Sequence, residues 1–196
     1  YKMNKSRFKI LIIDDTPANL QLLGQVLNQD YIIQIATSGK KGLAIAANDQ
    51  PDLILLDIMM PEMDGFEVCE RLKQDNKLAH IPVIFITALN DAATEVKCLS
   101  VGAVDFINKP INIKLARLRI DNFMERERLR RETLIKEQIK LAANVFNYSH
   151  DGILFSDAEN KIIKTNAAFT NITGYLPNEA VGKNPRFLQS GKQNQA

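Results

Sequence analysis

Four short apolar runs divide the first 110 residues of the chain, and a polar side chain stands at or just after the end of each. The runs cover residues 9–13, 52–56, 81–86 and 103–107, and patterns typical of helices lie between them. Apolar runs that alternate with helical patterns predict parallel strands joined by crossover helices. We therefore expect an α/β fold built on a doubly wound parallel sheet.

The polar side chains that follow these runs supply three carboxylates, a hydroxyl and an ammonium group. They are Asp14 and Asp15, Asp57, Thr87 and Lys109. The C-terminal ends of parallel strands lie at one edge of the sheet, so we expect these groups to converge there. A single strand-end aspartate is often only a solvated turn residue. Five such groups at one edge instead indicate a site.

The expected cluster restricts the chemistry of the site. Neighbouring carboxylates repel one another by roughly 4 kcal/mol per close pair at an effective dielectric constant of 20. They stay ionised together when a divalent cation lies among them, and hard oxygen ligands favour Mg2+. A carboxylate, a hydroxyl and an ammonium group beside Mg2+ suit the transfer of a phosphoryl group to aspartate.

Four motifs occur in this order along the chain: Asp14-Asp15 after an apolar strand, residues 56–65 (LDIMMPEMDG), residues 86–88 (ITA) and residues 108–110 (NKP). Together they resemble the receiver domain of bacterial two-component response regulators. The resemblance covers about residues 7–120, and it implies a five-stranded, flavodoxin-like receiver domain within residues 1–120.

The resemblance also implies the ligands and the phosphoacceptor. Asp57 would accept a phosphoryl group from the histidine of a sensor kinase or of a phosphotransfer protein. Asp15 and Asp57, with the backbone carbonyl of Met59, would bind Mg2+ directly, and Asp14 would act mainly through bound water. The chain would then be a phosphoacceptor switch and not a turnover enzyme.

The remaining motif positions resemble the switch residues of the family. Lys109 would pair with the acyl phosphate, and the Thr87 hydroxyl would move to it after phosphorylation. Phe106 would turn inward as Thr87 shifts, and Ala88 leaves room for the phosphoryl group. The bond between Lys109 and Pro110 is usually cis in the family, a conformation open to proline.

Two other functions compete with this interpretation. A Mg2+-dependent phosphatase or hydrolase can also use an aspartate nucleophile, but such enzymes need a second acid two positions later, where this chain has Met59. A scaffold with an inactive receiver is the other alternative, and the complete set of five polar groups argues against it. Met59 and Leu89 beside the site offer no side chain to position an attacking water, so we expect slow self-dephosphorylation.

Helix formers dominate after Pro110, and residues 111–146 contain no Gly or Pro. This composition predicts one helix that continues from the receiver through residues 111–147, and it would be roughly 50 Å long. Its C-terminal third carries two apolar rows: Ile135, Ile139, Ala142 and Phe146, and Leu134, Leu141, Val145 and Tyr148. This spacing predicts a parallel homodimer through residues 111–147. Residues 125–132 offer only Leu129 to such a seam, and a solvated charged helix is the alternative there.

Residues 166–175 (NAAFTNITGY) and 181–191 (VGKNPRFLQSG) resemble the first half of a PAS sensory domain. The resemblance implies a partial α+β PAS segment over residues 148–196. The chain starts at Tyr1 and stops within this domain, so we expect a fragment whose output domain, a cyclic-dinucleotide enzyme or a kinase, lies outside it. Pro185 stands where light-sensing PAS domains have a photoreactive cysteine, so no flavin photochemistry is expected. His150 is not expected to be a kinase phosphoacceptor because Gly152 breaks the helix that such a histidine needs.

Charge and composition fit a cytoplasmic signalling protein. The formal net charge is only +2, and residues 1–110 carry 11 basic and 14 acidic side chains against 9 and 5 in residues 111–140. The basic helix could touch nucleic acid, but without a visible helix-turn-helix or zipper we do not expect a nucleic-acid partner. No signal peptide or apolar run of spanning length is visible, so no membrane association is expected. Cys69 and Cys98 lack metal-ligand spacing and are expected to be buried.

Overall fold

The computed structural model describes residues 7–88 and 92–188. The chain divides into two compact units, Tyr1–Phe123 and Met124–Ala196. The first unit holds the parallel sheet, and the second holds most of a long helix together with a small α+β segment. Each unit is described by itself below.

The sheet of the first unit has five parallel strands in the order β2-β1-β3-β4-β5. Their bounds are β1 Lys9–Ile13, β2 Ile32–Ala36, β3 Leu53–Asp57, β4 Val83–Thr87 and β5 Asp105–Asn108. The winding direction reverses between β1 and β3, where ligands bind in open sheets of this kind. The predicted doubly wound, five-stranded parallel sheet is therefore confirmed. β3 and β4 each extend one residue beyond the predicted runs, so Asp57 and Thr87 are the last residues of their strands.

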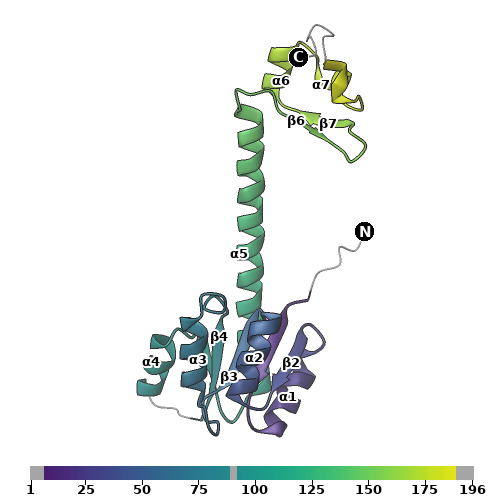
Figure 1. Ribbon diagram of the computed structural model, residues 1–196. Coiled ribbons are helices and arrows are strands. Elements are labelled where there is room, and N and C mark those ends of the chain that lie inside the picture. Colours follow the sequence, from purple (N-terminus) through teal and green to yellow (C-terminus); the bar gives the residue numbers. More distant parts are fainter. Residues whose placement is uncertain (1–6, 89–91, 189–196) are drawn as a thin grey trace. The chain divides into compact units, whose positions relative to one another are not determined.

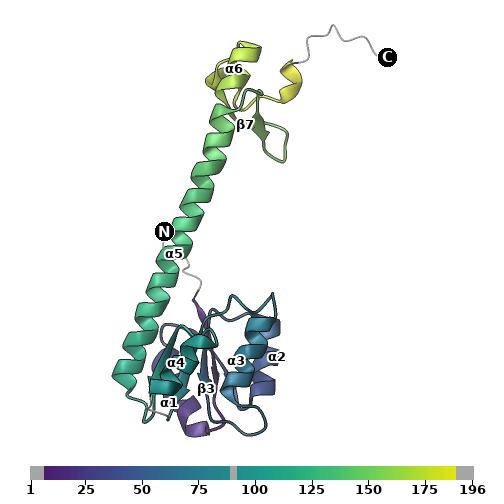
Figure 2. The same ribbon diagram turned by 90° about the vertical axis from the view of Figure 1, so that its left-hand side faces the viewer.

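Helices cover both faces of this sheet. Their bounds are α1 Pro17–Leu27, α2 Gly39–Asp49, α3 Gly65–Gln74, α4 Ala92–Ser100 and α5 Ile113–Tyr148. α1 and the first turns of α5 lie on one face, and α2 and α3 lie on the other (Figures 1 and 2). The strands that lie inside this sandwich can be apolar on both faces, which explains their continuous apolar runs.

The core of the first unit is centred on β3 and β4. Every residue of these two strands is buried. Phe85 of β4 lies beside Phe66 of α3 with a ring-centroid distance of 5.2 Å. Cys69 and Cys98 are both fully buried and unpaired, as the sequence predicted.

The start of α3 lies very close to the end of β3. The Asp64 carboxylate caps α3 by accepting a hydrogen bond from the backbone N–H of Glu67 at 2.8 Å. The next residue, Gly65, donates its N–H to the carbonyl of Ile58 at 2.9 Å. A Cβ at this position would clash with the carbonyl oxygen of Asp57 and lie 2.9 Å from Cα of Ile58. Glycine is therefore required here for close backbone approach.

α5 starts at Ile113, two residues after the predicted start. Asn112 precedes it as a cap, since its side-chain oxygen accepts a hydrogen bond from Leu115 N–H at 3.2 Å. The first turns of α5 belong to the first unit. There Arg117 donates to the carbonyl of Val26 at 3.0 Å, and Asp121 accepts a hydrogen bond from the Tyr31 hydroxyl at 2.7 Å.

The second unit adds two antiparallel strands and short helices to α5. Their bounds are β6 Leu154–Ser156, β7 Ile162–Thr165, α6 Ala167–Thr173, α7 Pro177–Ala180 and the 3-10 helix Pro185–Leu188. Ile162, Phe169 and Ala180 form a small buried cluster. The predicted partial α+β segment is confirmed for the residues that the structure describes. Across the described ranges, no helix is both long and apolar enough to cross a membrane.

The C-terminal end of α5 is built into the second unit. Phe146 is buried and stacks on Phe155 of β6 with a ring-centroid distance of 5.2 Å. Asn166 donates hydrogen bonds to the carbonyls of Phe146 and Asp151, at 3.0 and 2.8 Å. Placing Phe146 in an exposed seam was therefore wrong, because the sequence pattern of α5 does not show that the adjoining segment folds back over it. His150 is exposed just after the end of α5.

Candidate functional site

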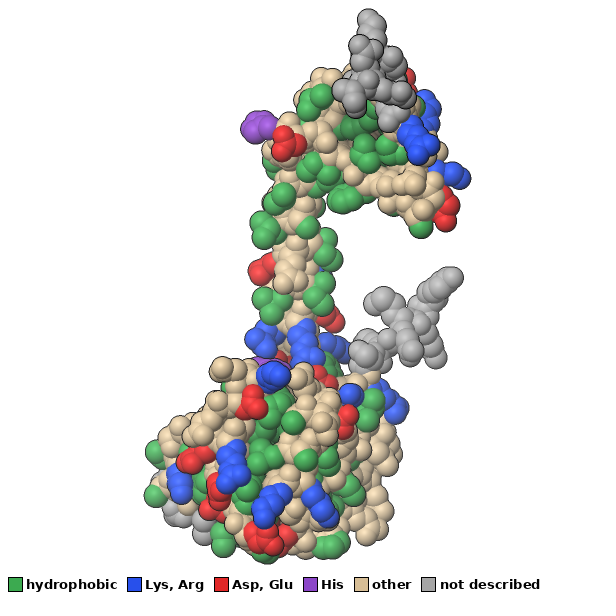
Figure 3. Space-filling view, in the orientation of Figure 1, with side chains coloured by type: hydrophobic (Ala, Val, Ile, Leu, Met, Phe, Trp, Pro, Cys, Tyr) green, Lys and Arg blue, Asp and Glu red, His purple; other side chains and the backbone are tan. Residues whose placement is uncertain are grey.

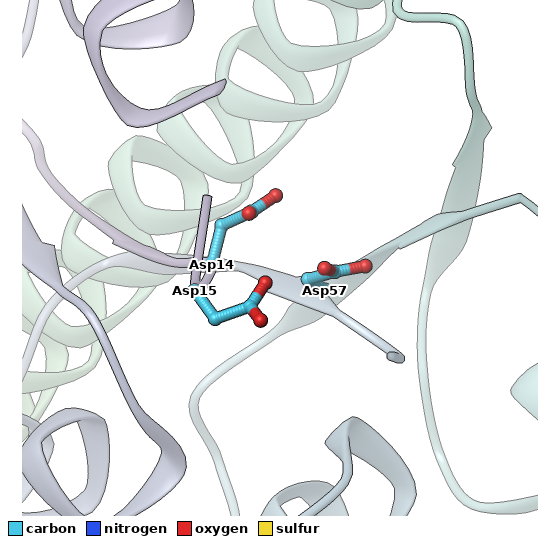
Figure 4. Close-up of side chains that lie close together, drawn as sticks. All are labelled: Asp14, Asp15 and Asp57. Atoms are coloured by element: carbon cyan, nitrogen blue, oxygen red, sulfur yellow. The ribbon is translucent and has the colours of Figure 1, made fainter. Parts of the chain in front are cut away.

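Three carboxylates meet at the edge of the sheet where its winding direction reverses. Asp14 and Asp15 follow β1, and Asp57 ends the neighbouring strand β3 (Figure 4). One ligand oxygen from each of the three side chains lies within 4.8 Å of the others. Asp14 and Asp57 are almost fully buried. A cluster of hard oxygen donors at this spacing is suited to a small divalent cation.

Lys109 brings a positive charge to the same place. Its Nζ atom lies 2.8 Å from Oδ2 of Asp57 and 3.4 Å from Oδ2 of Asp14. The backbone N–H of Lys109 donates to the carbonyl of Thr87 at 2.6 Å, which fixes the end of β5 against the end of β4. Groups that are 95 residues apart in the sequence, Asp14 and Lys109, are therefore in direct contact.

Burial and charge act in opposite directions on the two paired groups. Burial raises the pKa of Asp57 and the Asp14 charge adds to this, while the Lys109 hydrogen bond opposes it, and the net pKa lies above its ordinary value. Burial lowers the pKa of Lys109, but the hydrogen bond and charge of Asp57 outweigh it and the net pKa is raised. An added positive charge would therefore favour the ionised form of Asp57.

Asp14 is held in place by its own hydrogen bonds. Its Oδ1 atom accepts from the backbone N–H of Thr16 at 2.8 Å, and its Oδ2 atom accepts from the Asn19 side chain at 2.9 Å. Asn19 lies on the first turn of α1 and was not among the predicted site residues. The sequence signal for it was weak, since it is one amide five positions after an aspartate. Gly65, which lies against the backbone of Asp57 and Ile58, was also not among the predicted site residues.

The remaining predicted residues lie on β4 and β5 or directly after them. Thr87 is buried at the end of β4, and Ala88 follows it. Phe106 of β5 is half-buried, with the guanidinium carbon of Arg119 5.9 Å from its ring centroid. The peptide bond between Lys109 and Pro110 is cis, as the resemblance implied.

The apolar residues expected beside the site are described only in part. Met59 is 61% exposed, and its backbone N–H lies 3.4 Å from Oδ1 of Asp57. Leu89 lies outside the described residues. Met59 stands two positions after Asp57, where an aspartate-nucleophile phosphatase would have its second acid.

The sequence is similar to known families and proteins. Residues 10–121 match the response regulator receiver domain family, and residues 150–196 match a PAS domain family. "Response regulator PleD" of Caulobacter vibrioides is 49% identical over 105 residues, which are 53% of this chain and 23% of that protein. A "probable cyclic di-GMP phosphodiesterase" of Vibrio cholerae is 38% identical over 153 residues, 78% of this chain and 34% of that protein. The chain thus spans about a third or less of the length of these relatives.

The fold is also similar to solved structures. The signal receiver domain of a signal transduction histidine kinase from Syntrophus aciditrophicus aligns with a TM-score of 0.56 and 34% identity. The alignment covers 60% of this chain and 90% of that domain. Because the receiver family match covers more than half of the chain and agrees with the sheet and the carboxylate cluster, the chain belongs to the response regulator receiver family of two-component phosphorelay signalling, and a PAS segment follows its long helix.

Proposed function

We propose that Asp57 accepts a phosphoryl group from a phosphohistidine of a sensor kinase or of a phosphotransfer protein. The observation that carries this proposal is the position of its carboxylate, which lies 2.8 Å from Lys109 Nζ and has an oxygen within 4.8 Å of an oxygen of each of two further carboxylates. An Asp57 oxygen forms the new bond to phosphorus as the bond from phosphorus to the histidine nitrogen breaks. Lys109 then lies beside the negative charge of the acyl phosphate.

Asp57 is the best nucleophile of the three acids because of its surroundings. Both oxygens of Asp14 already accept hydrogen bonds, from Thr16 and Asn19. Asp15 accepts a hydrogen bond from the Thr16 hydroxyl at 3.2 Å and is the most exposed of the three carboxylates. Asp57 ends a strand at the centre of the sheet and keeps the shortest contact to the ammonium group.

The three carboxylates fit a resident Mg2+ ion. Asp14, Asp15 and Asp57, with the backbone carbonyl of Met59, would hold it. When bound, Mg2+ would neutralise the carboxylates and coordinate an oxygen of the incoming phosphoryl group. Without a cation the raised pKa of Asp57 reflects the cost of burying its charge.

Phosphorylation would act as a switch because it adds up to about two negative charges and three strong acceptor oxygens. We assign the response to Lys109, Thr87 and Phe106, which lie at the ends of β4 and β5 or within β5. Arg119 of α5 links this strand to the helix, since its Nη1 atom lies 2.8 Å from Oδ1 of Asp105 while its guanidinium lies over Phe106. A change in the position of Phe106 would therefore alter the contacts of Arg119 in the first turns of α5.

The wider proposal concerns output. A parallel homodimer through residues 111–147 would carry the change from the receiver, within residues 1–120, to the PAS segment over residues 148–196. The similar proteins are named as a phosphodiesterase of cyclic di-GMP and as a histidine kinase, so both a cyclic-dinucleotide and a kinase output are compatible with this chain.

We propose that the protein is a cytoplasmic switch without nucleic-acid or membrane partners. We also propose that it loses its phosphoryl group slowly by itself, because Met59 offers no group that positions an attacking water.

Labelling with acetyl phosphate and Mg2+ tests the phosphoacceptor. We expect intact-mass measurement to detect one added phosphoryl group on the parent chain, none on Asp57→Asn, and none when the cation is chelated. Asp151→Asn is a matched control, because it changes an exposed aspartate of the second unit. Undiminished labelling of Asp57→Asn would refute the assignment. Turnover of a phosphate ester by the parent chain would favour the phosphatase alternative.

A further inference from the structure

The middle of α5 leaves its apolar side chains uncovered. Every residue from Leu129 to Ala142 is exposed. Figure 3 shows hydrophobic side chains along this part of the helix. Contiguous exposed apolar rows of this kind mark interaction surfaces in soluble proteins.

The exposed side chains form two rows that face different directions. The first row has spacings of seven, four and three residues, which places its members on one face of a helix. Its members and their exposed fractions are Leu134 48%, Leu141 65%, Val145 63% and Tyr148 81%. The second row begins with Ile135 and Ile139, and it is turned about 100° around the axis, since each residue advances the helix by that angle.

Strand β6 of the second unit covers the last residue of the second row. Phe146, its last member, is only 6% exposed because β6 covers it, with Phe155 stacked on its ring. Lys164 places its Nζ atom 5.0 Å from the centroid of the same ring. A partner helix therefore cannot follow the second row to its end.

All members of the first row, including its last residue, are exposed to solvent, and an exposed apolar side chain of α6 follows it. Ile172 of α6 is 67% exposed. Tyr148 and Ile172 both line one open groove of about 280 Å3, together with His150 and Ala168. The apolar row on α5 thus reaches Ile172 of α6 at this groove, with the polar Gln138 between Leu134 and Leu141.

We propose that Leu134, Leu141, Val145, Tyr148 and Ile172 bind the same surface of a second copy of this chain in parallel orientation. We call these five residues the seam surface. The inference rests on the homodimer of the proposed function and names its contact residues. In the proposed dimer, Ile139 of the second row does not contact the second copy.

The size of the seam surface suits a second copy. From the exposed fractions of its members, each copy could bury roughly 600 Å2, so the pair would bury about 1,200 Å2, which reaches the range of specific interfaces. A surface that pairs with itself also satisfies the rule that two-fold dimers use the same patch on both subunits.

The neighbouring residues select the parallel orientation. In a parallel pair Gln138 of one copy lies opposite Gln138 of the other copy. Two side-chain amides can each donate a hydrogen bond to the other and accept one from it. In an antiparallel pair Ile172 would instead lie beside residues 125–132 of the second copy, where seven of eight side chains are charged. Removing those charges from water would be costly.

Sedimentation velocity of the unphosphorylated full chain at micromolar concentration tests the surface. We expect a dimer for the parent, and a dissociation constant at least tenfold higher for Leu141→Lys. Ile139→Lys is the matched control, because it adds the same charge to the same helix at an equally exposed position, and it should stay within threefold of the parent. A monomeric parent, or equal loss in both variants, would overturn the proposal.

Disulfide cross-linking of introduced cysteines tests the orientation of the two helices. Both native cysteines are fully buried, so the introduced cysteine would be the exposed thiol that reacts. With copper phenanthroline as oxidant, Leu134→Cys should cross-link to its own copy, and Ile139→Cys should not. Cross-linking only in a mixture of Leu134→Cys with Tyr148→Cys would show an antiparallel pair and refute the parallel seam. Neither experiment uses Asp57, so a failure of its labelling would leave these results unaffected.

Discussion

The central strands of the receiver and the middle of α5 carry equally regular apolar patterns, but they bury them differently. All residues of β3 and β4 are buried between two layers of helices, whereas residues 129–142 of α5 are all exposed. In the receiver, the chain supplies its own covering layers. Over the middle of α5 the described part of the chain supplies none, so the apolar side chains there are available to another chain. Periodicity therefore indicates which face is apolar but does not reveal what covers it.

The largest expected effect is in the core of the receiver. Phe85→Ala should lower the free energy of unfolding of the first unit by about 3–5 kcal/mol, because it leaves a cavity in a fully buried strand. Urea denaturation would measure this. Leu134→Ala on exposed α5 is the control and should change the unfolding of the first unit by less than about 0.5 kcal/mol. Similar losses of unfolding free energy in both variants would contradict the difference in burial between the receiver core and the middle of α5.

Asn166 tests whether the end of α5 is locked into the second unit. Its side chain donates to the carbonyls of Phe146 and Asp151 and accepts from the N–H groups of Ile153 and Phe169, at 2.8–3.0 Å. Asn166→Ala should destabilise the second unit by about 2–4 kcal/mol, because buried backbone groups lose their partners. Limited proteolysis should then cut within residues 150–188 much faster, while Asp57 labelling is retained.

The conservative variant Asn166→Asp refines this test. An ionised aspartate keeps the acceptor oxygen but replaces the donating amide nitrogen with a second acceptor oxygen, which would face the carbonyls of Phe146 and Asp151 without a hydrogen bond. We expect proteolysis at least as fast as that of Asn166→Ala, because the added carboxylate oxygen is buried and repels both carbonyls. A parent-like rate for Asn166→Ala would show that the end of α5 is not held by this amide.

Gly65 tests how closely the phosphoacceptor depends on backbone packing. Gly65→Ala would place a Cβ against the Asp57 carbonyl and should cost about 1–3 kcal/mol through overpacking. It should also slow the labelling of Asp57, since the end of β3 must move. Gly24→Ala is the matched control in α1, where a Cβ meets nothing within 4 Å. It should raise stability by up to about 1 kcal/mol and leave labelling unchanged.

The smallest effect is expected where α5 is fastened to the receiver. Tyr31→Phe removes the hydrogen bond to Asp121 and should cost about 0.5–1.5 kcal/mol in urea denaturation at neutral pH. Burial, followed by the Asp121 hydrogen bond, raises the pKa of Tyr31 above its ordinary value of 10.0. Its contribution is therefore complete below pH 10 and declines above it, as the unfolded phenol ionises. The difference between parent and variant should shrink from pH 9 to 11, and a constant difference would contradict the assignment.

Sequence reasoning predicted the receiver well because its strands are apolar on both faces and end in polar residues. Asp14, Asp57 and Lys109 were expected to converge, and the structure places them in contact. β2 was not identified, because as an edge strand it carries a mixed pattern with exposed Ile32 and Ile35. Asn19 was missed because its role depends on the turn between β1 and α1.

The sequence by itself determined the fold class, the position of the strand ends and the continuous helix after Pro110, because these follow from local patterns of hydrophobicity and from residue types that break helices. Tertiary structure decided which apolar residues have partners. Ile135 and Phe146 lie in the same predicted row, but Phe146 is 6% exposed and Ile135 is 55% exposed. The difference arises because β6 and Asn166 fold back onto the end of α5, a long-range contact that helical periodicity does not encode.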